Sequence, residues 1–191
     1  MDVVENRDLR AGLDEVDQRL QPQLARSWAI ARLDEICRSG STPAPQPEGF
    51  LRGRLVTASM SSPADAAIRR ITHLYQPWLG KSFDPATDEG VNLLKANART
   101  PLKVLWPSYE AEREYADRLE AFPFRTRIGA GAIDPDVQVL KIDYDYEANP
   151  SFIIRRILDE LVQIGEGIYL GKILYRLRST YRLIGYFSLE K

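Results

Sequence analysis

The stretch 137–189 constrains the fold of this chain most, because short apolar runs alternate there with turn residues. In 139–146, VLKIDYDY, apolar or aromatic side chains alternate with charged ones, which is the period of a half-buried strand. Residues 161–177 indicate two more strands joined at Gly165-Glu166-Gly167, and 181–189 alternate again. The stretch therefore predicts several β-strands, separated by short turns and ending almost at the C-terminus.

One part of this stretch, 151–164 (SFIIRRILDELVQI), fits either a helix or a strand. Its apolar residues recur at helical spacing, and Asn149 and Pro150 suit the cap and the first position of a helix. The hairpin that follows favours extended chain instead. We predict a short helical turn near 151–155 and a strand from Ile157 onward.

Residues 1–39 predict a helical arm, and 40–48 (GSTPAPQPE) predict a proline-rich linker of extended chain. The arm carries one apolar stripe at helical spacing, formed by Ala29, Ile30, Leu33, Ile36 and Cys37. This stripe predicts packing on the outside of the main domain or on a second copy of the chain, in a homodimer. A lid over a ligand cavity is the alternative. The main domain then spans 49–191.

The main domain opens with an apolar segment around two glycines (49–60), followed by a helix predicted over 63–75. Residues 91–106 are interpreted as one or two short strands or a strand plus loop, and 109–122 as a solvated helix or a long loop. Roughly seven to nine short strands with few crossover helices indicate an antiparallel sheet, which hides its edges by closing. We therefore predict a mainly β (α+β) fold: an antiparallel β-barrel with an N-terminal helical arm and a helix after the first strand.

Charge and cysteine content exclude several classes of function. With 26 basic and 27 acidic residues, the net charge of −1 gives no general attraction to nucleic acid or to an anionic membrane. No apolar run is long enough to span a bilayer, and the N-terminus lacks the apolar core of a signal peptide. Cys37 is the single cysteine, so no intrachain disulfide forms and a cytoplasmic location is expected.

Metal ligands and common catalytic signatures are also missing from the sequence. His73 is the single histidine and falls on the polar side of the predicted 63–75 helix, so no metal site of nitrogen and sulfur ligands is expected. No nucleophile elbow, phosphate-binding glycine loop, dinucleotide fingerprint or Cys/His pair is present. We therefore expect neither a metal nor another cofactor.

Three short blocks carry a resemblance to a known family. They are Gly49-Phe50-Leu51-Arg52-Gly53, Trp78-Leu79-Gly80-Lys81-Ser82-Phe83, and the ending formed by Tyr169-Leu170-Gly171-Lys172 and Gly185-Tyr186-Phe187-Ser188-Leu189. Together they resemble the bacterial family named for its GXWXG motif, with Leu51 standing where that motif has tryptophan. The resemblance covers 49–189 and implies a calycin-like barrel, related to lipocalins, fatty-acid-binding proteins and nitrobindins. A nitrobindin-like haem site would need a histidine on a late strand, and none follows His73, so no haem is expected.

If the barrel closes, one face of every strand lines its interior, and a few polar groups among apolar ones make a typical small-molecule site. The expected ligand-binding residues are Trp78, Lys81, Arg125, Arg127, Lys141 and Lys172. The expected acid–base groups are Asp143, Asp145, Tyr169 and Tyr186. In the alternative interpretation, Lys141, Asp143 and Asp145 form the solvated face of a one-sided sheet.

Three hypotheses of function follow, from three different classes. In the first, the barrel binds a small hydrophobic molecule that bears a polar end. In the second, a cofactor-independent cyclase or isomerase uses the same cavity for acid–base catalysis. In the third, the protein is an interaction module whose helical arm mediates dimerisation and whose barrel is filled by side chains.

Overall fold

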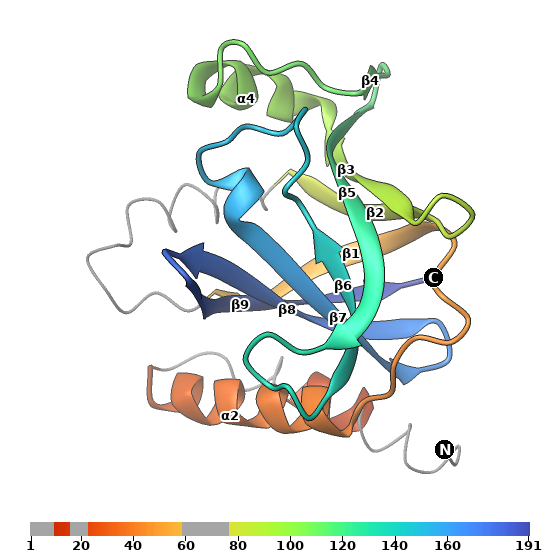
Figure 1. The fold of residues 1–191 in the computed structure, drawn as a ribbon, viewed down its shortest axis with the longest axis vertical. Helices are drawn as coiled ribbons and strands as arrows, with labels where there is room; N and C mark the ends of the chain where they lie inside the picture. Colours follow the sequence, from red (N-terminus) through yellow and green to blue (C-terminus); the bar gives the residue numbers. More distant parts are fainter. Residues whose placement is uncertain (1–9, 16–22, 59–76) are drawn as a thin grey trace.

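The computed structural model describes residues 10–15, 23–58 and 77–191. Residues 10–15 are helical, and helix α2 covers Gln23–Ser39 (Figure 1). The helix predicted over 63–75, with His73, lies outside the described residues. No helix within the described ranges combines the length and the apolar character needed to cross a bilayer.

Besides these two helices, the described chain forms nine strands and three short helical segments. The strands are β1 (Gly49–Ala58), β2 (Trp78–Asp84), β3 (Glu89–Lys95), β4 (Arg113–Glu114), β5 (Arg118–Ala130), β6 (Gln138–Asp143), β7 (Ile157–Gly165), β8 (Ile168–Leu177) and β9 (Thr180–Glu190). The helical segments are η1 (Ala96–Ala98), α4 (Arg99–Leu105) and η2 (Ile154–Arg156).

Eight of these strands close into an antiparallel barrel. Their order is β3-β2-β1-β9-β8-β7-β6-β5, and an additional pairing between β3 and β5 closes the ring. The two-residue strand β4 pairs only with β5, outside the ring. The sequence-based prediction of a mainly β, antiparallel barrel is therefore confirmed.

Because neighbouring strands run in opposite directions, the connections gather at two ends of the barrel. One end, which we call the α4 end, holds the β3–β5 connection with η1 and α4, the β6–β7 connection with η2, and the β8–β9 turn (Figure 1). The opposite end holds the β2–β3, β5–β6 and β7–β8 turns.

The buried apolar side chains form two clusters, one inside the barrel and one outside. Strand β6 illustrates the division: Leu140 and Ile142 belong to the inner cluster, whereas Val139 belongs to the outer one. Successive side chains of a strand point to opposite faces, so one strand supplies both clusters.

Helix α2 covers the outer cluster. Its buried residues Ala29, Leu33, Ile36 and Cys37 pack with outward-facing side chains of the barrel such as Leu170, and it lies against β7 and β8. The apolar stripe of the arm is thus buried against the chain's own main domain. Packing on the outside of the main domain was one of the interpretations that the sequence offered. A homodimer through the N-terminal helices stays a prediction.

Three local predictions can be compared with the structure. Residues 151–153 form a turn, η2 follows, and β7 begins at Ile157, which confirms a short helical turn before a strand. The interpretation of 91–106 as strands and loop is wrong in its second half, where η1 and α4 form. Residues 109–122 hold β4 and the start of β5 instead of a helix or a long loop.

Candidate functional site

A buried ion pair crosses the interior of the barrel. Lys81 on β2 and Asp159 on β7 place Nζ and Oδ2 at 3.0 Å, and neither side chain has any exposed surface. Three strands separate β2 from β7 in either direction around the ring, so the two residues come from opposite walls. Both project inward because they alternate with residues of the outer face, a consequence of the two-residue period of a strand.

Two further polar side chains complete this interior cluster. The Tyr144 hydroxyl donates to Asp159 Oδ2 at 3.1 Å and accepts a hydrogen bond from Lys81 Nζ. Asn92 Oδ1 accepts from Lys81 Nζ at 3.0 Å and from Trp78 Nε1 at 3.1 Å. The three protons of the Lys81 ammonium thus have three acceptors. Asp159 Oδ1, in contrast, is buried and has no hydrogen-bond partner among the described residues.

Four aromatic rings surround the Lys81 ammonium. Nζ lies 4.9 Å from the ring centroid of Tyr144, 5.1 Å from Phe187, 5.3 Å from Trp78 and 5.4 Å from Phe124. Rings at such distances attract a cation through their negative faces. The four rings, which we call the aromatic box, replace part of the hydration that the ammonium loses.

Three glycines make room for three rings of the aromatic box. A Cβ placed at Gly53, Gly90 or Gly171 would lie 2.4, 2.3 or 2.2 Å from the ring of Trp78, Phe124 or Phe187, respectively. Only a residue without a side chain fits beneath each ring. The glycines at positions 53 and 171, which stood out in the sequence, are therefore explained by the placement of rings around Lys81.

Burial shifts the pKa values of Lys81 and Asp159 in opposite directions. Loss of water lowers the pKa of Lys81, although Asp159 opposes the change. Loss of water raises the pKa of Asp159, opposed by Lys81 and by the Tyr144 hydroxyl. The ionised and the neutral forms of the pair are thereby brought closer in free energy than they are in water. Such groups concentrate at functional sites.

Three of the ten site residues expected from the sequence lie in the interior. Trp78, Lys81 and Tyr169 all face the inner cluster or its polar centre. Burial raises the pKa of the Tyr169 hydroxyl. These three side chains lie in the barrel interior, and their roles in binding or catalysis stay predictions.

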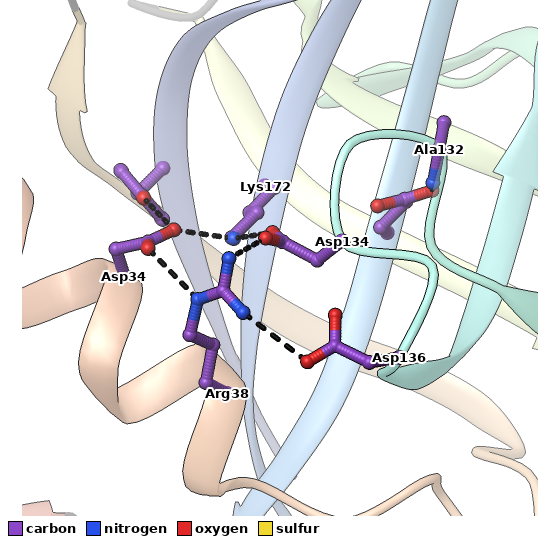
Figure 2. Close-up of polar contacts among 8 residues, drawn as sticks. Asp34, Arg38, Ala132, Asp134, Asp136 and Lys172 are labelled. Carbon is purple, nitrogen blue, oxygen red and sulfur yellow. Dashed lines mark hydrogen bonds and ion pairs between the residues drawn. The ribbon is translucent and has the colours of Figure 1, made fainter.

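Lys172 and Tyr186 face outward, so the prediction that they line the interior is wrong. Lys172 Nζ lies between two carboxylates, 2.5 Å from Asp34 Oδ1 of α2 and 2.5 Å from Asp134 Oδ2 of the β5–β6 turn (Figure 2). The Tyr186 hydroxyl donates to Asp34 Oδ1 at 3.3 Å. Arg38 of α2 also pairs with Asp134. These five residues form an outer ion cluster that attaches α2 to the barrel.

The remaining expected residues also lie outside the barrel interior. Lys141 pairs with Glu160 at 3.5 Å, and both alternate with inward-facing neighbours. Asp145 is exposed and pairs with Arg155 at 2.7 Å, which holds the pKa of its carboxyl below the usual range.

Three more of the expected residues lie outside the barrel interior, contrary to the prediction. Asp143 shares the outward face of β6 with Lys141, and Arg125 and Arg127 are exposed on β5. Inward positions on these strands are occupied by apolar side chains such as Phe124 and Ile142. The alternative interpretation, a solvated face of charged residues, is correct for Asp145, which is exposed, whereas Lys141 is buried on the outer face of the barrel.

The sequence-based reasoning missed Asn92, Tyr144 and Asp159. Asp159 belongs to a charged run with Arg155, Arg156 and Glu160, and such a run is typical of ion pairs at the surface. A signal was nevertheless present, because Ile157, Asp159 and Leu161 share one face of β7, and a carboxylate between two such residues indicates a buried partner. Across the described ranges, no group of three His, Cys, Asp or Glu side chains could hold a metal ion.

The fold and the site together define a closed antiparallel β-barrel with a polar cluster inside an aromatic interior. Comparison with models of protein families finds no match, and comparison with curated proteins finds no relative. A solved structure described as "Crystal structure of protein from Thermomonospora curvata" aligns with a TM-score of 0.48 and 16% identity, over 93% of this chain and 98% of that chain. This likeness carries no argument about function, and the resemblance to the GXWXG-motif family stays a prediction.

Proposed function

We propose that the barrel interior binds a small hydrophobic molecule that bears a polar end. The observation that carries this proposal is the Lys81–Asp159 pair, which lies without exposed surface among aromatic and aliphatic side chains. An apolar site with a few convergent polar groups is the usual composition of a small-molecule site.

The energetics of the pair support a role beyond stability. Removing two charges from water is expensive, and apolar residues of similar volume commonly stabilise a protein as well as a buried ion pair does. The barrel already closes through backbone pairing of β3 with β5. A polar centre at Lys81 and Asp159 is therefore better explained by recognition of a polar group.

The hydrogen-bonding capacity that remains unused in the interior cluster indicates the polar end of the ligand. Lys81 has acceptors for all its protons, and its charge is balanced by Asp159. Asp159 Oδ1 is the acceptor that still lacks a donor. The polar end should therefore be uncharged and should donate a hydrogen bond, as a hydroxyl or a protonated carboxyl group does.

A ligand reaches Asp159 by displacing a side chain, because Lys81 and Asp159 have no exposed surface. Among the rings of the aromatic box, Trp78 keeps the most contact with solvent, with 8% of its surface exposed. We expect its ring to move when a ligand binds, so its indole signal should report binding in the interior.

Isothermal titration of decanol and of decyl methyl ether tests this proposal, because the ether has the chain but no donor. A hydrogen bond to a charged group contributes about 1.5–3 kcal/mol, so decanol should bind more tightly by about tenfold or more. The Lys81→Met/Asp159→Leu variant should bind both compounds equally. Lys172→Met, which removes a buried lysine outside the barrel, is the matched control and should keep the preference. Equal binding of the two compounds by the unaltered protein would contradict the proposal.

Acid–base catalysis on the same ligand class is the second candidate, favoured by the opposite pKa shifts at Asp159 and Lys81. Asp159 would carry the proton, and Tyr144 would donate a hydrogen bond to the substrate's oxygen. The acid–base role expected of Asp143, Asp145 and Tyr186 passes to these interior residues. A cofactor-independent isomerase of this kind would convert a β,γ-unsaturated ketone to its conjugated isomer, which absorbs in the ultraviolet. Asp159→Asn should then abolish turnover, and turnover unchanged by this substitution would exclude the mechanism.

A further inference from the structure

A second site lies at the α4 end of the barrel, apart from the interior cluster. It is a surface cleft of about 370 Å³, within the range of small-molecule sites. One wall comes from the segment after α4, with Trp106, Ser108 and Tyr109, and the other from residues 147–152 and Arg155 of the β6–β7 connection. Neither Lys81 nor Asp159 lines this cleft.

The first wall of the cleft is aromatic and rigidly held. The ring of Tyr109 stacks on Phe122 with centroids 5.1 Å apart, and Trp106 meets the same ring edge-on at 5.7 Å. The Tyr109 hydroxyl accepts the Phe122 backbone N–H at 2.7 Å. Trp106 is 9% and Tyr109 7% exposed, so a small, rigidly held part of each ring contributes to the cleft.

The second wall contains a buried acceptor without a donor. Asn149 Nδ2 donates to the backbone oxygens of Pro123 at 2.7 Å and Tyr144 at 3.0 Å, which fixes the orientation of its amide. Asn149 Oδ1 is then left without a hydrogen-bond partner among the described residues, in a side chain that is 3% exposed. Buried acceptors are nearly always satisfied, so this oxygen needs an explanation. A ligand N–H would supply the missing bond once the side chains over this oxygen shift, because the oxygen has less than 1 Å² of accessible surface.

The rim of the cleft is strained. Ile153 has φ 77 and ψ −69, and Ile154 N donates to Phe152 O at 3.2 Å, which makes a γ-turn with positive φ. A β-branched residue rarely adopts this conformation, and such strain concentrates at ligand-binding segments. The turn buries Ile153 and leaves the neighbouring Phe152 ring 54% exposed beside the cleft.

The charges of the cleft lining cancel. Glu147 and Arg155 are the two charged residues in it, and the Arg155 guanidinium is already held by Asp145 at 2.7 Å. A charged ligand would therefore gain little from the lining. We infer that this cleft binds a small neutral molecule with N–H donors, such as a carboxamide, in contact with Trp106 and Tyr109 and bonded to Asn149.

Titration of the ¹⁵N-labelled full chain with benzamide tests this inference by nuclear magnetic resonance. The indole N–H signal of Trp106 and the amide signals of Asn149 should shift, and the shifts should reach a plateau as benzamide is added. Trp78 donates to Asn92 in the interior polar cluster, Trp28 lies on α2, and neither lines the cleft, so neither signal should follow benzamide. Benzoate, which is charged and has no N–H donor, should bind more weakly by about tenfold or more.

Filling the cleft provides the control. Ala148→Phe places a ring in the cleft lining at an exposed position and should weaken benzamide binding by about tenfold or more, whereas Ala132→Phe, exposed at the opposite end, should not. The inference is overturned if benzamide moves no Trp106 signal, or if Ala148→Phe binds it unchanged. Decanol should shift Trp78 and not Trp106, so the failure of one site leaves the other independently testable.

Discussion

The substitution Gly171→Ala tests whether the glycine beneath Phe187 is needed for the aromatic box. An alanine Cβ there would lie 2.2 Å from Phe187 Cζ, whereas ordinary contact begins at 3.4 Å, so the ring must withdraw by 1.2 Å. Phe187 has no exposed surface and packs edge-on against Trp78 at 5.7 Å, which leaves it little room. Overpacking of this kind costs about 1–3 kcal/mol. For a chain of this length, each kcal/mol shifts Tm by about 2–4 °C, so Tm should fall by about 2–12 °C.

Thermal unfolding followed by circular dichroism measures this effect. Gly129→Ala on β5 is the matched control, because its Cβ would meet nothing closer than 3.7 Å at a negative φ. That control should be stabilising by about 0.4–1 kcal/mol, since alanine restricts the unfolded chain. In a Phe187→Leu background, Gly171→Ala should cost less, because the smaller side chain can yield. An unchanged Tm for Gly171→Ala in the native background would refute the argument.

Three further predictions concern single residues. Lys81→Met leaves Asp159 buried without its cation and should lower the free energy of unfolding by about 3–5 kcal/mol. The double variant Lys81→Met/Asp159→Leu should lower it by less than half of that amount, because no charge is left unpaired. Urea unfolding measures both losses, and equal losses would contradict the reasoning. Burial alone would raise the pKa of Asp34, but bonding to Lys172 and a neighbouring arginine lowers it. Stability from this carboxylate is complete above its ordinary pKa of 3.8 and is lost as pH falls through the lowered value. The decrease in the free energy of unfolding from neutral to acid pH should therefore be smaller for Lys172→Met than for the unaltered protein. Urea unfolding at both pH values measures this decrease. Arg178 has φ 55 in the β8–β9 turn, so Arg178→Gly should be stabilising by about 1 kcal/mol, and a lower Tm would count against this.

The closed sheet could be predicted from the sequence because alternation and turn residues mark most strands. Helix α4 could not, because it is short and buries only Leu102, so no helical stripe exists to be recognised. The last strand shows another limit. A bulge in β9 between Leu183 and Gly185 makes Ile184 an extra residue, and it joins the same inner cluster as Phe187. Such a break in the two-residue period cannot be placed from residue types alone.

The interior site was only partly predictable, for a reason that lies in α2. This helix covers the outer face of β8, so Leu170 outside is as fully buried as Ile173 is inside. When both faces of a strand are apolar, the sequence does not reveal which one faces the interior. Lys81 could be found because the resemblance marked its segment. Lys172 was assigned to the wrong face of β8 because both faces of this strand are apolar.

The two buried lysines show why the interior pair, and not the outer ion cluster, is the functional candidate. Burial by itself lowers the pKa of Lys172, but hydrogen bonds to Asp134 and Asp34 outweigh it and the net pKa is raised. Lys81 is more deeply buried and is bonded by Asp159, and here the loss of water dominates, so its pKa is lowered. A lysine held by two carboxylates stays charged at neutral pH and serves to attach α2. Burial shifts the pKa values of Lys81 and Asp159 toward each other, so the two groups titrate as a coupled pair. The interior pair also keeps an unpaired acceptor, Asp159 Oδ1, beside which a polar group can bind, whereas Lys172 in the outer cluster is already held by two carboxylates.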